Sequence, residues 1–395
     1  MTQRRRRPTI IDVAQEAGVS VGTVSHVLNG TANVRPATRA LVEAAIQRLA
    51  FRPNALARSL TSVGRDVAGA ARLSLPRLMT VGYISVDYIA RVEVLPHRDD
   101  RITATGIRKA VGGPAANVAA AAAALGGVCA LDVELATAVG DDADSEWALQ
   151  ELGARGVHVL PVRRPPQNRL SRCFVIVEAS GNRTIINEPF ELAAADLGFP
   201  LEPDAARRPQ CLHVEGYQAL AMRDAITRFR EAGWRTSLHS TGLPAGLRDP
   251  QGFAALLGQL DVAFLNQPTA RAVLDLRGGV EALVAAFGDY LGGVAGRGIV
   301  VLTLDEHGAA VFDRDGSAAR VAAPLTPVVD ATGAGDTFAG VFLGYWLHGA
   351  APVEAARRAV VAGSLAVTAE GAQARLAQAC EIDALVGRPV LTTPP

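Results

Sequence analysis

The chain has 395 residues, of which 49% are hydrophobic, and its formal net charge is zero. This length predicts two or three domains with a sizeable core, and because the first residues are charged and lack an apolar segment, we expect no secretory signal. The four cysteines are widely spaced without a CxxC pair, so they indicate neither a metal site nor a disulfide framework, and we expect a protein of the reducing cytoplasm.

The charge is distributed unevenly along the chain. Residues 1–60 contain nine arginines and three acidic residues, a net charge of +6, which leaves about −6 for the remainder. A basic segment joined to an acidic body is typical of a polyanion-binding module attached to a second domain. The alternative is that the arginine run at 4–7 is only a solvated tail.

Residues 9–60 are predicted to form short helices. Gly18 permits a turn, Ser20 can cap a second helix, and Pro36 begins a third. The apolar side of this third helix is expected to consist of Leu41, Ile46 and Leu49.

The chain from residue 79 onward alternates apolar runs with helical patterns, which predicts an α/β domain with a largely parallel sheet. A run of alanines at 115–125 is too short to cross a membrane and is predicted to be a packed helix. The predicted domains are a helical headpiece at 1–62, a linker at 63–78 and the α/β domain at 79–388. The apolar runs that predict strands lie at 79–86, 173–177, 211–214, 262–265 and 299–304.

The helical segment closely matches one family of DNA-binding proteins. The stretches TIIDVAQEAGVSVGTVSHVLNG at 9–30 and RPATRALVEAAIQRLAFRPNALARSL at 35–60 resemble the headpiece of the LacI family of repressors. The resemblance implies a small all-α helix-turn-helix domain whose recognition helix enters the major groove of DNA. A generic three-helix bundle is the alternative.

The LacI pattern also implies roles for single residues. His26 can hydrogen-bond a purine edge, whereas Val21 offers only apolar contact to a base. Leu60 matches the leucine that the family wedges into the minor groove from a hinge helix at 54–60, and the alternative is that it packs on its own domain. Because such hinge helices form in pairs, the resemblance implies a homodimer and a near-palindromic operator. The residues implied to contact DNA are Ser20, Val21, Gly22, Thr23, Ser25, His26, Asn29 and Leu60.

The stretch VVDATGAGDTFAG at 328–340 suits phosphoryl transfer. Gly333, Ala334 and Gly335 form a small-residue turn that opens a helix, so backbone N–H groups and the helix dipole can hold a phosphoryl group. Asp336 lies in the first turn of that helix, where a carboxylate can take the proton of an attacking hydroxyl. The stretch resembles the motif D-T-x-G-A-G-D of the PfkB/ribokinase family of carbohydrate kinases, in which the last Asp is that base.

This second resemblance covers about residues 79–385 and implies a ribokinase-like αβα sandwich with a small β lid. Lid strands are expected around 89–106 and 168–188. ATP and Mg²⁺ are the implied cofactors, and Asp330 is a candidate ligand for a monovalent cation such as K⁺. The expected partners are therefore operator DNA and a small sugar or sugar derivative, with no membrane.

Two further stretches resemble the sugar-binding parts of the kinase family. In AVGGPAANVAAAAAALG, Gly112 and Gly113 match a di-glycine that lets the backbone approach the sugar, and Asn117 matches a residue that binds its hydroxyls. A glycine-capped alanine helix is the alternative. Asp87 matches the acid that grips sugar hydroxyls. Arg172 falls where phosphofructokinase-like members bind a substrate phosphate, so the resemblance implies a substrate with a phosphate or carboxylate group. The alternative is that Arg172 is a surface arginine on a lid strand. An uncharged sugar or a nucleoside is also a possible substrate.

The nucleotide side departs from the family pattern at two positions. Thr303 and Gly308 match the nucleotide turn T-x-G-x-x-G, but Asp305 replaces its middle glycine. Asn266 matches the first residue of the family's N-x-x-E, but Thr269 replaces the glutamate that the family links to Mg²⁺.

Two functions from different classes follow. One is a DNA-binding transcriptional regulator fused to an ATP-dependent sugar kinase with Asp336 as general base, and the intact glycine motif favours it. The other is a non-catalytic regulator that uses the kinase fold as a metabolite sensor, and the replacements at Asp305 and Thr269 favour it. A kinase with a vestigial headpiece is a third reading.

Overall fold

The computed structural model describes residues 16–19, 23, 36–48, 74–163, 169–178, 183–188 and 208–386. The chain divides into two compact units, residues 1–73 and residues 74–395, and each unit is described by itself. Among the described residues, no helix combines the length and the apolar character that crossing a membrane requires.

The first unit contains helix α3 (Pro36–Arg48), which begins at the predicted Pro36. Gly18 has a φ of +65°, as its predicted turn requires. The predicted apolar side of α3 was wrong at Leu41, which is 53% exposed, whereas Val42 and Ala45 are buried. The predicted Ile46 is half-buried, and Leu49 lies outside the described residues. Residues three apart share a helix face, and Leu41 lies about 100° around the helix from its neighbour Val42.

The second unit is built on a nine-stranded sheet with the order β13-β12-β11-β10-β9-β8-β1-β4-β5. From β11 to β5 in this order, all neighbouring strands pair in parallel, whereas β12 pairs antiparallel with both β11 and β13. This confirms the largely parallel sheet that the apolar runs predicted, since a parallel sheet is buried on both faces. The strands are β1 (Arg77–Val81), β4 (Asp132–Ala138), β5 (His158–Arg163), β8 (Gln210–Glu215), β9 (Arg235–His239), β10 (Val262–Asn266), β11 (Ile299–Thr303), β12 (Ala309–Phe312) and β13 (Ala318–Val321).

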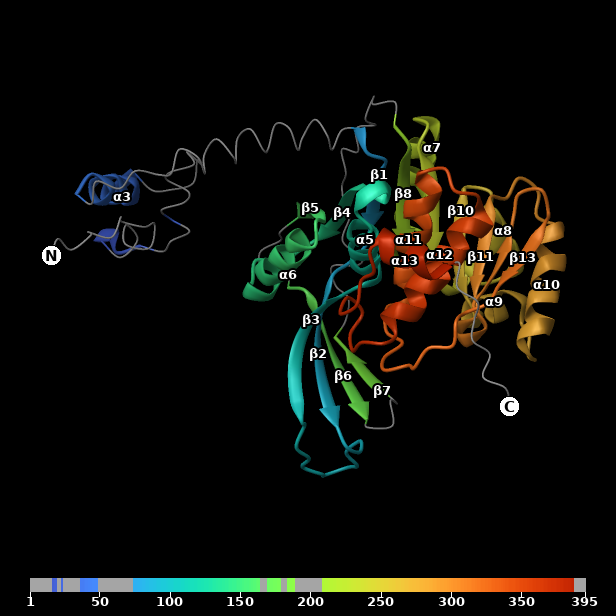
Figure 1. Ribbon diagram of the computed structural model, residues 1–395, viewed down its shortest axis with the longest axis horizontal. Coiled ribbons are helices and arrows are strands. Elements are labelled where there is room, and N and C mark those ends of the chain that lie inside the picture. The colour runs from blue at the N-terminus through green and yellow to red at the C-terminus, as the bar shows by residue number, and fades with distance from the viewer. Residues whose placement is uncertain are drawn as a thin grey trace. The chain divides into compact units, whose positions relative to one another are not determined.

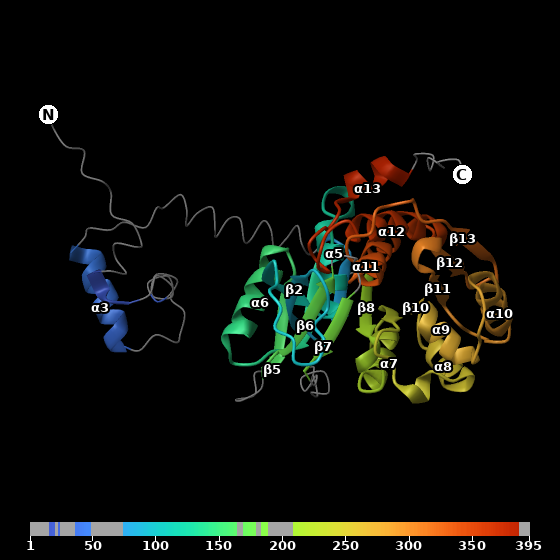
Figure 2. The ribbon, with the colours of Figure 1, turned by 90° about the horizontal axis from the view of Figure 1, so that it is seen from below.

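Helices cover both faces of this sheet, as Figure 2 shows, so the predicted αβα sandwich is confirmed. One face carries α5 (Pro114–Ala124), α11 (Ala334–Leu347) and α12 (Pro352–Ala366). The alanine-rich α5 is almost completely buried between the sheet and α11, because small side chains let the backbones approach closely. The other face carries α7 (Arg223–Glu231), α8 (Pro250–Leu257) and α9 (Gln267–Leu274). The remaining α-helices in the described part of this unit are α6 (Ala143–Ala154), α10 (Val280–Gly292) and α13 (Ala379–Val386).

A second sheet of four strands, with the order β3-β2-β6-β7, projects from the main sheet as a lid (Figure 1). The single apolar run predicted at 79–86 is in fact divided between β1 in the main sheet and β2 in the lid. The difference arises because an apolar run does not reveal which of two sheets a strand joins. The lid strands are β2 (Ser85–Val92), β3 (Gly106–Gly112), β6 (Ser171–Glu178) and β7 (Arg183–Asn187).

The cysteines differ in accessibility, which gives a direct test of the fold. Cys129, Cys173 and Cys211 are buried and only Cys380 is exposed. Burial raises the pKa of the Cys173 and Cys211 thiols to about 12, so these two stay protonated at pH 8. Because the thiolate is the reactive form, we expect the native protein to react rapidly with one equivalent of a thiol reagent, and with all four only after unfolding. In Cys380→Ser the fast phase should disappear, and a second fast thiol would contradict the packing described.

Candidate active site at the amino-terminal end of α11

Asp336 lies in the first turn of α11, which begins directly after Gly333. Gly333 has a φ of +75°, and a Cβ there would lie 2.5 Å from the Cβ of Ala372. Only glycine fits this combination of left-handed backbone and close approach. The first N–H groups of a helix have no partner within the helix, so this end of α11 can accept an anion beside the Asp336 carboxylate.

Side chains from two separate segments contact the Asp336 carboxylate, and a third segment supports one of them. Asn117 on α5 donates from Nδ2 to Oδ2 of Asp336 at 2.8 Å. The Nε2 atom of His239, at the end of β9, is 3.2 Å from Oδ1 of Asp336. Gln373, in the loop after α12, donates from Nε2 to Oδ1 of Asn117 at 2.9 Å. The carboxylate is therefore held in one orientation by groups far apart in the sequence.

His239 stacks on a second buried histidine. The rings of His213 and His239 are 5.8 Å apart between centroids and nearly parallel. The pKa of His213 is lowered well below its usual value by burial and by neighbouring His239, so His213 stays neutral. Its Nδ1 atom is 2.8 Å from Oγ of Ser237. The sequence predicted neither histidine, and the only available signal is that both lie near the carboxyl ends of adjacent parallel strands, where sites of α/β folds gather.

Glu215, at the end of β8, is a second residue that the sequence did not predict. Its side chain is completely buried. It accepts hydrogen bonds from the backbone N–H of Tyr83 at 3.0 Å and of Ala115 at 3.3 Å. Burial raises its pKa well above the usual value, against the effect of these two bonds. Glu215 thus joins β8 to the start of α5, the helix that carries Asn117.

The substrate-binding residues predicted from the sequence lie at one junction of lid and sheet. Asp87 on β2 accepts a hydrogen bond from Oγ of Ser85 at 2.8 Å. A Cβ at Gly112 would lie 2.3 Å from Oδ2 of Asp87, so the two predicted residues are in direct contact. Gly113 is the N-cap of α5, four residues before Asn117. Burial raises the pKa of Asp87.

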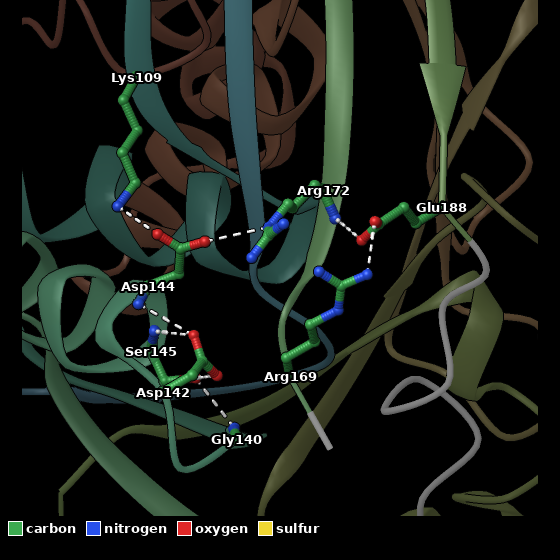
Figure 3. A network of polar contacts seen from close by, with 8 residues as sticks. All are labelled: Lys109, Gly140, Asp142, Asp144, Ser145, Arg169, Arg172 and Glu188. Carbon is green, nitrogen blue, oxygen red and sulfur yellow. Dashed lines mark hydrogen bonds and ion pairs between the residues drawn. The ribbon is translucent and has the colours of Figure 1, made fainter. Parts of the chain in front are cut away.

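Arg172 lies elsewhere, in the polar network of Figure 3. Its Nε atom donates to Oδ2 of Asp144 at 3.1 Å, and Lys109 Nζ donates to Oδ1 of the same carboxylate at 2.6 Å. Burial opposes ionisation of Asp144, but Lys109 and Arg172 lower its pKa overall. In the register of the lid Arg172 pairs with Val86, not with Asp87, so the two predicted sugar ligands occupy opposite lid faces.

The predicted nucleotide-binding residues cluster at the ends of β10 and β11. Asn266 and Thr303 are paired across these strands. Asn266 caps α9 through a bond from Thr269 N–H to its Oδ1 at 2.9 Å, and Thr303 Oγ1 donates to Leu265 O at 3.1 Å. Asp305 has a φ of +51°, the left-handed backbone that the replaced glycine would adopt readily. Its carboxylate accepts from Gln267 Nε2 at 2.8 Å. Gly308 ends this turn just before β12.

Asp330 joins two loops beside α11. Its Oδ1 accepts from both N–H and Oγ1 of Thr332, at 2.9 and 2.6 Å, and its Oδ2 accepts from Gly371 N–H at 2.8 Å. The structure gives Asp330 this linking position, and its role as a ligand of K⁺ stays a prediction. No group of three or more His, Cys, Asp or Glu side chains able to hold a metal ion occurs in the described ranges.

Of the residues predicted to contact DNA, only Thr23 is described, and it is helical. The others lie outside the described residues: Ser20, Val21, Gly22, Ser25, His26, Asn29 and Leu60.

Comparison with known proteins identifies two families along the chain. Residues 75–379 match the pfkB family of carbohydrate kinases, and residues 9–54 match the lacI family of bacterial regulatory proteins. An ATP-dependent ribose-1-phosphate kinase of Halopiger xanaduensis is 28% identical over 75% of this chain and 94% of its own length. Catabolite control protein A of Priestia megaterium is 59% identical over 61 residues, which are 15% of this chain and 18% of that protein.

Solved structures share the fold of the second unit. The ribokinase of Arabidopsis thaliana, solved with ribose and ATP, has a TM-score of 0.62 and 23% identity, and the match covers 80% of this chain and all of that one. The nucleoside kinase of Burkholderia thailandensis, solved with inosine, has a TM-score of 0.61 and 23% identity, covering 78% of this chain and 95% of that one. At this identity the likeness concerns the fold alone.

Proposed function

The chain belongs to the pfkB family of carbohydrate kinases, and from this membership and the contacts of Asp336 we propose that it transfers the γ-phosphoryl group of ATP to a hydroxyl of a sugar or sugar derivative. Asp336 acts as the general base. The single observation that carries this proposal is the carboxylate of Asp336 at the amino-terminal end of α11, which accepts a hydrogen bond from Asn117 and lies 3.2 Å from Nε2 of His239.

Each part of this site has a distinct task in the proposed reaction. The Asp336 carboxylate accepts the hydroxyl proton as the oxygen attacks the γ-phosphorus. The backbone N–H groups after Gly333 hold the oxygens of the transferred group, because the helix dipole favours negative charge there. Asn117 and His239 keep the base in one orientation, which lowers the entropic cost of reaching the transition state.

Mg²⁺ fits this site as a companion of the nucleotide. When bound, it neutralises charge on the transferred phosphoryl group. Because Mg²⁺ prefers phosphate and water oxygens, it does not need a cluster of protein carboxylates, which the described residues do not offer. The sugar would lie against Asp87, Gly112 and Asn117, which meet at the base of the lid.

One observation favours the second function, a sensor without turnover. Thr269 stands where the kinase pattern has a glutamate, and its N–H is used to cap α9 through Asn266. Asp305 adds a negative charge on the nucleotide side, where it would repel ATP phosphates unless Gln267 keeps it turned away. Both replacements would slow catalysis without preventing sugar binding.

The test is ATP consumption with Mg²⁺ and K⁺ across sugars, sugar phosphates, sugar acids and nucleosides. Sugar phosphates belong in this set because a relative named ribose-1-phosphate kinase aligns over most of the chain. Turnover that disappears in Asp336→Asn would support the kinase. An absence of turnover, together with a sugar that raises the melting temperature, would support the sensor.

The lacI-type segment extends the proposal to transcription. This segment matches the lacI family of bacterial regulatory proteins, and we propose that it forms a helix-turn-helix that binds a near-palindromic operator as a homodimer. A sugar bound in the second unit would alter DNA affinity only through its different affinity for two arrangements of the dimer. Sugar binding in the kinase unit would then regulate the genes whose operator the lacI-type segment binds.

We expect His26→Ala and Leu60→Ala to weaken operator binding. Loss of one base contact costs about 1–3 kcal/mol, so the dissociation constant should rise roughly 5- to 150-fold. The operator is first selected from a random duplex pool, and affinity is then measured at fixed salt, because phosphate contacts make it salt-dependent. Unchanged affinity in both variants would instead indicate a vestigial headpiece.

A further inference from the structure

The two faces of the lid carry different side chains. Directly opposed residues of neighbouring strands project from the same face of a sheet, and successive residues alternate. In the register of the lid, Asp87 is opposed to Ala110 and Cys173, and Ile89 is opposed to Arg108. These five residues therefore share one face, which we call the sugar face because it contains Asp87.

Arg172 and Lys109 lie on the opposite face. Both are ion-paired with Asp144 at the start of α6, and Figure 3 shows the two side chains reaching the same carboxylate. The Lys109 ammonium also lies 3.9 Å from the centre of the Trp147 ring. The cations of this face are thus held against α6, and they join the lid to the main domain.

Arg108 is a cation of the sugar face, and it reaches the loop that carries Gln373. Its Nη2 atom donates to the carbonyl oxygen of Glu370. A Cβ at Gly371 would lie 3.3 Å from this Nη2 atom and 3.4 Å from Cδ1 of Ile89. Because Gln373 of the same loop bonds Asn117, which in turn bonds Asp336, Arg108 stands at the rim of the proposed active site.

A second arginine joins Arg108 at this rim, and both make only loose ion pairs. The Nη2 atoms of Arg91 and Arg108 are 3.4 and 3.8 Å from the same Oε2 atom of Glu370. Their side chains are 47% and 45% exposed, whereas that of Glu370 is 21% exposed. Two guanidinium groups therefore share one carboxylate, and half-exposed pairs of this kind contribute little to stability. A substrate anion whose oxygens can be contacted bidentately by a guanidinium can displace such a carboxylate.

We infer that Arg108, assisted by Arg91, binds an anionic group, a phosphate or a carboxylate, carried by the sugar that this site accepts. This inference rests on the proposed function and names its substrate class. It assigns to Arg108 the role that the sequence suggested for Arg172, because Arg108 shares a face with Asp87 and Arg172 does not. The anionic group binds at the rim, away from the hydroxyl that Asp336 deprotonates.

The test compares neutral and anionic sugars on the full-length protein. Turnover is measured with ribose, fructose and glucose, with their phosphates, and with gluconate, for the wild type and Arg108→Gln. The wild type should have its lowest KM for an anionic sugar. Arg108→Gln should raise that KM at least tenfold while leaving kcat, the KM for ATP and the KM for neutral sugars within twofold. The phosphate and gluconate arms decide which anion is recognised.

Two matched variants separate this role from a structural one. Arg172→Gln removes a lid cation from the opposite face and should leave the KM of the anionic sugar unchanged. Glu370→Gln removes the competing carboxylate and should lower that KM or leave it unchanged. If the bond from Arg108 to the carbonyl oxygen of Glu370 merely latched the lid, Arg108→Gln would raise the KM of neutral and anionic sugars alike, which would overturn the inference. A larger loss in Arg172→Gln than in Arg108→Gln would overturn it as well.

A binding measurement keeps the inference testable if the proposed kinase activity fails. With no turnover on any sugar, the melting temperature is measured with the same compounds. An anionic sugar that stabilises the wild type and Arg108→Lys, but not Arg108→Gln, would support the anion site while refuting catalysis. Equal stabilisation of all three proteins, or stabilisation by neutral sugars only, would refute the anion site.

Discussion

Replacing Asp336 by asparagine is expected to lower kcat by about 10²–10⁴-fold, the range that a positioned general base contributes. An amide cannot accept the hydroxyl proton at this position, but it has nearly the same size and shape. Its oxygen can still accept the hydrogen bond that Asn117 donates to Oδ2 of Asp336. The change therefore removes the chemistry while the packing of α11 stays intact.

The measurement is kcat and KM with the best sugar of the panel, together with the melting temperature. We expect KM for the sugar and for ATP to change little, since neither depends on proton transfer. The melting temperature should stay within a few degrees of the wild type. If Asp336→Asn kept more than a tenth of the wild-type kcat, Asp336 would not be the base and the proposed mechanism would be wrong.

Gly333→Ala is expected to have the second largest effect, because it changes both the anion-binding turn and the loop beneath it. A residue other than glycine in a left-handed backbone costs about 1–3 kcal/mol. The added Cβ would also lie 2.5 Å from the Cβ of Ala372 and 2.8 Å from its Cα, so the loop must move. This loop carries Gln373, which holds Asn117 against Asp336. We expect kcat to fall by about 10²–10³-fold, as when a preorganised donor is lost.

The melting temperature is the second measurement for Gly333→Ala, and it tests the effect on stability. A loss of about 1–3 kcal/mol in a domain of this size lowers it by roughly 2–10 °C. Gly335→Ala is the matched control for stability, because a Cβ at Gly335 meets no atom within 4 Å and this position lies inside α11. If both variants melted together with the wild type, the close approach at Gly333 would be refuted.

Parts of the site are encoded locally, and these could be predicted from the sequence. The turn at Gly333 and the position of Asp336 depend on residues that are neighbours along the chain, so a short motif contains them. Asp87 and Gly112 were each implied by a separate family motif, whereas their contact follows from the pairing of lid strands β2 and β3. Similarly, Asp305 replaces the middle glycine of the nucleotide turn T-x-G-x-x-G, and it has the positive φ that a glycine would adopt there.

Other parts of the site depend on strand ends that meet only in the folded sheet. His239 and Glu215 end strands that are adjacent in the sheet but separated by a helix in the sequence. Neither belongs to a short motif. Glu215 directly follows the apolar run at 211–214, and His239 ends a strand, Arg235–His239, that no apolar run predicted. Gln373 reaches Asn117 across 256 positions of the chain. Such contacts follow from topology, and residue spacing does not contain them.

Local patterns of glycine, charge and hydrophobic periodicity were sufficient to predict the resemblance to two families, the parallel sheet and the residues around the phosphoryl-binding turn, because each of these depends on residues that are close along the chain. Strand pairing in the folded lid decided which lid arginine shares a face with Asp87. A shift of one residue in strand register transfers a side chain to the other face of a sheet, and the motif around Arg172 does not specify that register. In the structure, the pairing of Ile89 with Arg108 fixes the register of β2 and β3, and this register places Arg108 on the same face as Asp87.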